Sequence, residues 1–263
     1  MIKMAVTYRI YPLKVGSLPN LPKVNTTYLA NQGVFVEAPL FAFLLRGSNG
    51  SNILVDTGCW DKDYAWSLLN YEVHVYPEDH VLAVLKRDFG LEATDIDCVI
   101  NTHLHFDHCF ANDAFPGKPI YIQKSEIEFA KNPWSFFAVT YEAPSLGFSP
   151  NWQKAEDQIV PVEGEFEVAE GITLIPLPGH SPGMQGVLVD TDAGKYLLPG
   201  DQVNLYEQLE SNPVIPYVIP GIHTSVTDCM ESMEKILSLI AEGVTVLPSH
   251  DDKVAEHKCY PAE

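Results

Sequence analysis

Three histidines and an aspartate stand close together near the middle of the chain: His103, His105, Asp107 and His108. Neutral imidazole and carboxylate groups together suit a borderline divalent metal, and zinc above all. Four such groups in one short run are more than a tetrahedral zinc needs once ligands from elsewhere also join it. The motif therefore predicts a metal site, and its excess of ligands suggests two metals.

Three further residues of ligand type each follow a strand-like run and a turn that contains Pro or Gly. They are His180, Asp201 and His250. Loops at strand ends on a rigid scaffold are where functional sites are usually built. Any one of these turns would be ordinary, but chance is a poor explanation for all three together with the histidine motif.

The elements that must position these residues follow from hydrophobic periodicity. Strands are expected over Pro39–Arg46, Asn52–Asp56, Asp97–Asn101, Pro119–Gln123, Ile172–Ile175, Gln185–Asp190, Tyr196–Leu198 and Val244–Leu247. Helices are expected over Glu78–Phe89, Ser125–Lys131 and Val226–Ala241. In the last helix, Thr227-Asp228 is expected to form the N-terminal cap and Gly243 to mark the end.

The order His-x-His-x-Asp-His, Gly-His, Gly-Asp, Ser-His resembles that of the metallo-β-lactamase superfamily. Asp56-Thr-Gly also resembles that family's Asp-Thr-Gly signature, so the resemblance spans nearly the whole chain. The motif Thr-His-Leu-His-Phe-Asp-His-Cys and the later motif Ser-His-Asp251 most resemble those of the N-acyl-homoserine lactonase branch. Pyridoxolactonase-type enzymes are near neighbours in that branch. The resemblance implies an α/β fold, a four-layer αββα sandwich formed by residues 1–263 as a single domain.

The resemblance also implies a role for each motif residue, because all seven ligand positions carry the expected residue types. The first metal would be held by His103, His105 and His180. The second metal would be held by Asp107, His108 and His250, and both metals would share Asp201. The expected cofactor is two Zn2+, with iron or manganese as alternatives. This ligand count leaves coordination space for a water and a substrate.

The implied chemistry is the hydrolysis of an ester or a lactone. Zinc lowers the pKa of bound water to roughly 7, so hydroxide is available at neutral pH to attack the carbonyl carbon. As the resemblance implies, Asp107 would carry a proton to the oxygen that leaves when the ring opens. Asp56 is a candidate for orienting an imidazole from behind, although fixing its own turn explains it equally well.

Two positions depart from the lactonase pattern. Homoserine lactonases of this type have a tyrosine three residues after the bridging aspartate, placed to hydrogen-bond the substrate carbonyl, and here that residue is Asn204. The nearest tyrosine is Tyr206, so either Asn204 or Tyr206 is expected to assist the carbonyl oxygen. Phe110 stands where related enzymes often have a glycine, and it is expected to narrow or reshape the floor of the site.

Composition narrows the class of protein and of partner. The formal net charge of −19 argues against nucleic acid, because phosphate binding demands a basic face. Hydrophobic residues make up 46% of the 263 positions, yet no apolar run reaches the ~18 residues of a membrane-spanning helix. No signal peptide is recognisable, and five scattered cysteines without a Cys-x-x-Cys pair suit a reducing compartment, so a cytoplasmic protein is expected.

Two irregular segments are expected to determine the substrate specificity. Residues 132–158 form an insertion that carries the aromatic residues Trp134, Phe136, Phe137, Tyr141, Phe148 and Trp152. So long a connection is often a lid or binding loop, but aromatic residues also mark interfaces, so a pocket wall and a homodimer contact stay open. The stretch Tyr8–Val36 has the same ambiguity. An apolar rim would suit a small-molecule substrate with an apolar portion, such as an acyl chain.

Other activities with the same ligands remain alternatives. A different hydrolase of this fold would act on a thioester, an ester or a cyclic amide. A persulfide dioxygenase-like oxidoreductase would bind a single iron and activate oxygen. Metal stoichiometry separates the oxygenase from the hydrolases, and a panel of substrates separates the hydrolases from each other.

Overall fold

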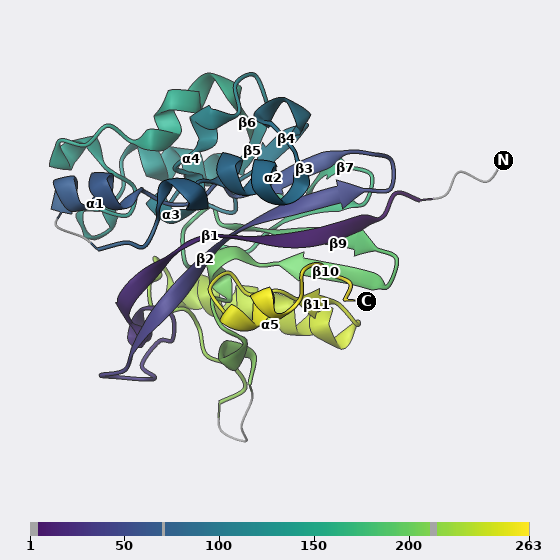
Figure 1. Cartoon of the computed structure of the whole chain (residues 1–263). Coiled ribbons are helices and arrows are strands. Elements are labelled where there is room, and N and C mark those ends of the chain that lie inside the picture. The colour runs from purple at the N-terminus through teal and green to yellow at the C-terminus, as the bar shows by residue number, and fades with distance from the viewer. Residues whose placement is uncertain (1–4, 70–71, 211–214, 263) are drawn as a thin grey trace.

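The structure, a computed structural model, describes residues 5–69, 72–210 and 215–262, and its strands form two sheets (Figure 1). The first sheet has the order β1-β2-β3-β4-β5-β6, and its strands are Tyr8–Pro22, Phe35–Gly47, Asn52–Val55, Cys98–Ile100, Ile120–Gln123 and Ile159–Val162. The second has the order β11-β10-β9-β8-β7, and β7 to β11 span Phe166–Ala169, Ile172–Pro176, Gln185–Thr191, Gly194–Leu198 and Thr245–Val246.

Strand direction brings the site loops to one edge of the molecule. In the first sheet β1, β2 and β3 pair antiparallel, whereas β3 to β6 are parallel and therefore end on the same side. The ends of β3 and β4 are joined directly, because Asp56 N donates to Ile100 O at 2.8 Å. In the second sheet only β10 and β11 are parallel. Side chains that follow these strands can therefore meet.

Helices cover both outer faces of the paired sheets. The α-helices α1 to α5 span Lys62–Leu69, Val81–Phe89, Phe106–Cys109, Lys124–Lys131 and Val226–Ala241. Figure 1 shows α1 to α4 on one side and α5 on the other. Phe43 of β2 and Val187 of β9 share the core between the sheets, while Leu85 of α2 and Met233 of α5 are buried in the two outer cores. This arrangement confirms the predicted αββα fold.

The prediction that Tyr8–Val36 is irregular is wrong, because most of the segment is strand β1 at the edge of the first sheet. Three prolines lie in this strand. An edge strand tolerates proline, since its outward N–H groups need no partner. Register shifts between Lys14 and Ser17 and between Leu18 and Leu21 also break the alternation that would have revealed a strand.

The segment 132–158 contains three short 3-10 helices, η5, η6 and η7, at Ser135–Phe137, Pro144–Leu146 and Asn151–Gln158. Five of its six aromatic side chains divide into two sets, and the sixth, Phe148, is half-buried. The buried set packs in a small core beside the histidine motif and comprises Phe137, Tyr141 and Trp152. Trp134 and Phe136 are instead 61% and 83% exposed. The segment is therefore partly core, and only its outer part is available for a contact between subunits.

Helix ends were predicted less well than helix positions. The range of α5 is confirmed as Val226–Ala241, but its N-terminal cap is Ser225, whose hydroxyl accepts a hydrogen bond from Asp228 N at 3.2 Å. Thr227-Asp228 lies inside the helix. Gly243 follows the end of the helix with a φ of 94°, a left-handed conformation that favours glycine. Among the described residues, no helix is both long and apolar enough to cross a membrane.

Candidate metal centre

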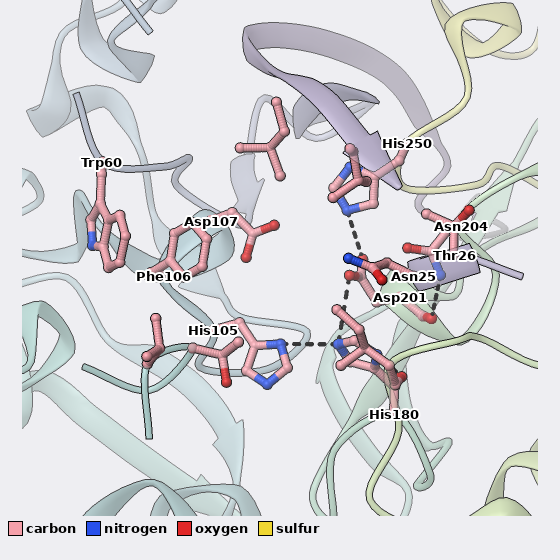
Figure 2. A pocket seen from close by; sticks show the side chains of 15 residues that line it. Asn25, Thr26, Trp60, His105, Phe106, Asp107, His180, Asp201, Asn204 and His250 are labelled. Atoms are coloured by element: carbon pink, nitrogen blue, oxygen red, sulfur yellow. Dashed lines mark hydrogen bonds and ion pairs between the residues drawn. The ribbon is translucent and has the colours of Figure 1, made fainter. Parts of the chain in front are cut away.

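The seven predicted ligands come from five places in the fold. Two follow β4, two lie on α3, and one each follows β8, β10 and β11; in chain order they are His103, His105, Asp107, His108, His180, Asp201 and His250. Six of the seven are buried, and Asp107 is partly exposed. Figure 2 shows five of these side chains around one cavity. Residues far apart in the sequence therefore meet at one place in the fold, where these strands end.

Their potential ligand atoms form two groups, and within each group all atoms lie within 4.8 Å of one another. The first group is His103, His105 and His180. The second group is Asp107, His108, Asp201 and His250. The carboxylate of Asp201 also reaches the first group, because its Oδ2 lies 3.6 Å from His180 Nε2 while its Oδ1 lies 3.1 Å from His250 Nε2 and 3.2 Å from His108 Nε2.

Backbone carbonyls orient two of the imidazoles. His180 Nδ1 lies 2.7 Å from Ile222 O, and His250 Nδ1 lies 2.8 Å from Pro39 O. A carbonyl oxygen only accepts hydrogen bonds, so each Nδ1 carries a proton, and in the neutral form of each ring Nε2 presents a lone pair. Both lone pairs face the cluster, where they can bind a cation.

Asp56 orders the histidine motif from behind. Its Oδ1 accepts a hydrogen bond from Thr102 N at 2.8 Å, and its Oδ2 accepts one from the Thr102 hydroxyl at 2.9 Å. Because that hydroxyl donates to the carboxylate, it accepts from His103 Nδ1 at 3.0 Å. Asp56 Oδ2 also lies 2.8 Å from His108 Nδ1. Asp56 therefore orients an imidazole, as considered, while the backbone that its carboxylate holds is that of Thr102 in the histidine motif and not its own turn.

The donor set fits divalent cations. His103 Nε2 is buried and has no hydrogen-bond partner among the described residues, although buried polar atoms are normally paired. His105 Nδ1 and His180 Nε2 face each other at 3.0 Å, and a cation held by both would satisfy two facing lone pairs. Imidazole nitrogen with carboxylate oxygen is the donor chemistry that zinc prefers.

Protonation differs between the two groups. Burial lowers the pKa of His103 and of His105 well below the usual range, and the neighbouring imidazoles lower both further. Burial would also lower the pKa of His108 and His250, but the carboxylate of Asp201 raises both. Burial opposes ionisation of Asp201, yet the facing His250 and His108 hold its pKa well below the usual value. The first group is therefore neutral and ready to bind a metal, and Asp201 is ionised.

A buried carboxylate that the sequence did not single out joins two of the site loops. Glu126 Oε1 accepts hydrogen bonds from Leu104 N at 3.0 Å and from the Tyr141 hydroxyl at 2.7 Å. Its Oε2 accepts from the Ser181 hydroxyl at 2.7 Å and from Gly183 N at 3.0 Å. The histidine motif and the turn after β8 are thus tied to one side chain. Nothing in its local sequence distinguishes Glu126 from a surface residue of a helix.

A cavity of about 180 Å³ opens onto the ligand groups (Figure 2). Its polar side includes His105, Asp107, His180, Asp201, Asn204 and His250. Its apolar side is lined by Leu18, Leu21, Trp60, Phe106, Val139 and Ile222. Trp60 and Phe106 stack with ring centroids 3.9 Å apart. Val139 belongs to the segment 132–158, so part of that segment forms a wall of the cavity.

The structure separates the two candidates for assisting the substrate carbonyl. Asn204 lines the cavity, and its Nδ2 donates to Asp201 O at 2.9 Å. Tyr206 does not line it; the ring packs against the core between the sheets, with Lys253 Nζ 5.9 Å from its centroid. The prediction that Phe110 shapes the floor is wrong, because Phe110 lies in a neighbouring cavity against Tyr64.

Comparison with known proteins agrees with this geometry. The family model of the metallo-beta-lactamase superfamily matches residues 38–250. An N-acyl homoserine lactonase from a Bacillus species is 32% identical over 197 residues, which cover 72% of each chain. The N-acyl homoserine lactonase AttM from Agrobacterium fabrum is 27% identical over 265 residues and covers 92% of this chain and 93% of the relative.

A solved structure of a quorum-quenching N-acyl homoserine lactone lactonase superposes with a TM-score of 0.74 at 26% identity, over 95% of this chain and 94% of the other. The matched range contains all seven ligand-type residues, from the histidine motif to His250. Sequence, fold and comparisons therefore agree: this chain belongs to the metallo-beta-lactamase superfamily, in the group that contains the N-acyl homoserine lactonases.

Proposed function

We propose that this protein is a dinuclear metal hydrolase that opens the ring of lactones, with N-acyl homoserine lactones as the foremost substrates. The observation that carries the proposal is that two groups of ligand-type side chains lie next to each other beside a partly apolar cavity, with Asp201 of the second group 3.6 Å from His180 of the first. The relatives named as N-acyl homoserine lactonases support the choice of substrate.

The proposed cofactor is two Zn2+. The first would be held by His103, His105 and His180. The second would be held by Asp107, His108 and His250, and both would share Asp201. When bound, the cations supply a strong nucleophile from water at neutral pH and polarise the carbonyl oxygen. Asp56 and the carbonyl oxygens behind the imidazoles keep the ligand nitrogens aimed at the centre.

Asp107 moves the proton in the proposed reaction. Water adds to the lactone carbonyl carbon, and the Asp107 carboxylate accepts the proton that this water loses. The bond between the carbonyl carbon and the ring oxygen then breaks, and Asp107 returns the proton to that oxygen, which becomes a hydroxyl group. The new carboxylic acid ionises in solution, so each turnover releases one proton. Asp107 lines the cavity and is 11% exposed, which suits contact with a substrate.

Asn204 is the proposed donor to the substrate carbonyl. One of the two N–H groups of Nδ2 donates to Asp201 O, and this bond fixes the amide plane. The other N–H group remains available to a ligand. The position of Tyr206 outside the cavity supports Asn204 over Tyr206. The apolar side of the cavity would hold the acyl chain.

Three further features complete the proposal. The whole chain is proposed to act as a single domain, and its exposed Trp134 and Phe136 would suit a homodimer contact. A reducing compartment, and hence the cytoplasm, is supported by five free cysteines. Neither a nucleic acid nor a membrane is proposed as a partner.

The test combines metal analysis with an assay of proton release on one preparation, using short- and long-chain N-acyl homoserine lactones. We expect two zincs per chain and acid release with both substrates. Two zincs without turnover would keep a hydrolase but reject these lactones as its substrates. A single iron would reject the proposal in favour of an oxygenase that acts on a persulfide.

A further inference from the structure

We propose that Asn25 recognises the amide group of an N-acyl lactone, and so selects lactones that carry an amide beside the ring over simple alkyl lactones. The inference rests on the proposed lactonase function and assigns a residue to the part of the substrate that does not react. Asn25 belongs to no sequence motif of the site and stands outside the family match at residues 38–250.

Asn25 lies on a turn that covers the cavity. The turn is the 3-10 helix η1, Lys23–Asn25, which directly follows strand β1. Asn25 and the next residue, Thr26, line the same cavity as Asp107 and His250. Figure 2 labels both side chains among those that line the cavity, in the view beside Asp201 and Asn204; we call this turn the roof.

Hydrogen bonds hold the roof in one conformation. The hydroxyl groups of Thr26 and Thr27 both donate to Lys23 O, at 2.8 Å and 2.9 Å. Outside the turn, Tyr28 N donates to Ile219 O at 2.9 Å. These bonds fix the backbone on both sides of Asn25, and a fixed backbone reduces the conformational entropy lost when its side chain binds a ligand.

Residues 221 and 222 connect the roof to the metal centre. Ile222 N donates to Asn25 O at 2.9 Å, and Ile222 O accepts from His180 Nδ1 at 2.7 Å. The two segments are so close that a Cβ atom on Gly221 would lie 1.8 Å from Val24 O, a contact that no side chain can make. Ile222 therefore connects the backbone of Asn25 directly to the candidate metal ligand His180.

The amide of Asn25 is available to a ligand. Within the described ranges its side chain makes no hydrogen bond to another residue, whereas the Thr26 hydroxyl donates to Lys23 O and one N–H of the Asn204 amide donates to Asp201 O. A carboxamide offers a carbonyl acceptor and two N–H donors. It therefore complements a secondary amide, which has one donor and one acceptor.

The substrate has one polar group that the proposed reaction leaves unused. The metal centre and Asn204 would bind the ring carbonyl oxygen, and Asp107 would donate a proton to the ring oxygen. An N-acyl lactone still has its amide, which would otherwise be buried without hydrogen bonds in an apolar cavity. An alkyl lactone of equal chain length lacks this group, so it gives a direct comparison.

The experiment compares Asn25→Ala with the wild-type protein on N-hexanoyl homoserine lactone and on a γ-alkyl butyrolactone of similar chain length. Loss of one or two hydrogen bonds is expected to raise KM for the N-acyl lactone by about 3- to 10-fold. The kcat for that substrate and both constants for the alkyl lactone are expected to stay within about twofold. Where the alkyl lactone binds without opening, its inhibition constant replaces KM.

The matched control is Asn31→Ala. Asn31 Nδ2 lies 2.7 Å from Glu207 Oε1 and 3.1 Å from Thr27 Oγ1, so it supports the same turn without lining the cavity. If either substitution only loosened the roof, KM would rise by the same factor for the N-acyl lactone and for the alkyl lactone. An equal change for both substrates, or none, in Asn25→Ala would overturn the role of Asn25. Failure of the wild-type protein to open any lactone would instead reject the proposed function.

Discussion

The two ends of the cavity are built on different physical principles. At the polar end, six of the seven candidate ligands are buried, and four of the imidazoles have a protein partner behind the ring: Thr102 for His103, Asp56 for His108, Ile222 O for His180 and Pro39 O for His250. Away from the polar end, Asn25 of the roof and Val139 of segment 132–158 are not fully buried, and the roof is held by hydrogen bonds from Thr26, Thr27 and Tyr28.

Because of this difference, substitutions in the roof can change substrate specificity without changing the metal centre. The polar end tolerates little change, because removal of one buried partner leaves another polar atom unpaired. The roof presents the Asn25 side chain from a backbone that is held by Thr26, Thr27 and Tyr28, so a substitution of Asn25 is expected to change recognition more than folding. Mutations in the two regions are therefore expected to differ in both size and kind.

The largest effect is expected from Asp201→Ala, because both groups lose the carboxylate that they share. We expect metal content well below two per chain and a loss of kcat/KM of about a thousandfold or more, since metal ions supply several kcal/mol to the transition state. Metal analysis and acid release measure both quantities. Asp190→Ala, which breaks only an exposed ion pair with Lys195, is the control. Two tightly bound metals in Asp201→Ala would contradict the shared ligand.

The next effect is expected from His250→Ala, which removes a ligand of the second group only. We expect about one metal per chain and abolished ring opening, because the leaving oxygen loses its stabilising charge. Elemental analysis and the same assay test this result. His74→Ala, at an exposed histidine beside Glu37, should behave as wild type. Near-normal turnover in His250→Ala would rule out the dinuclear proposal.

A smaller effect is expected from Glu126→Gln, which keeps the shape of the side chain but places an NH2 group opposite hydrogen-bond donors. Changes at groups that orient ligands typically cost about 10- to 100-fold in metal affinity, and we expect such a loss at the first metal. Competition with a chelator measures it, and cobalt spectra report the ligand geometry. Glu128→Gln, exposed on the same helix, is the control. Unchanged affinity would limit Glu126 to a role in folding.

The smallest effects are expected from substitutions of Asn204 and Tyr206, the two residues considered as donors to the substrate carbonyl. Asn204→Ala is expected to lower kcat/KM by about tenfold, the value of one hydrogen bond made in the transition state. Tyr206→Phe is expected to stay within about twofold, because its ring lies outside the cavity. Kinetics on one N-acyl lactone compare the two variants. If alanine at both positions leaves kcat/KM unchanged, neither residue assists the carbonyl oxygen.

Sequence reasoning located the elements better than it located their partners. Central strands such as β4 and β9 were predicted because their apolar runs are continuous or alternate. The edge strand β1 was missed because proline and register shifts hide its periodicity. Phe110 was placed at the floor of the site from its position next to the histidine motif, but α3 turns its side chain toward Tyr64 instead.

The sequence alone predicts the chemistry of the centre. The histidine motif, His180, Asp201 and His250 each follow a strand, and their residue types and order are visible without coordinates. Only the tertiary structure decided how they are supported and what faces them. Glu126, Ile222 and Asn25 act through contacts between segments distant in the chain, such as the bond from His180 to a carbonyl 42 positions away. Local sequence carries no signal for such contacts, because they form only when separate elements pack together.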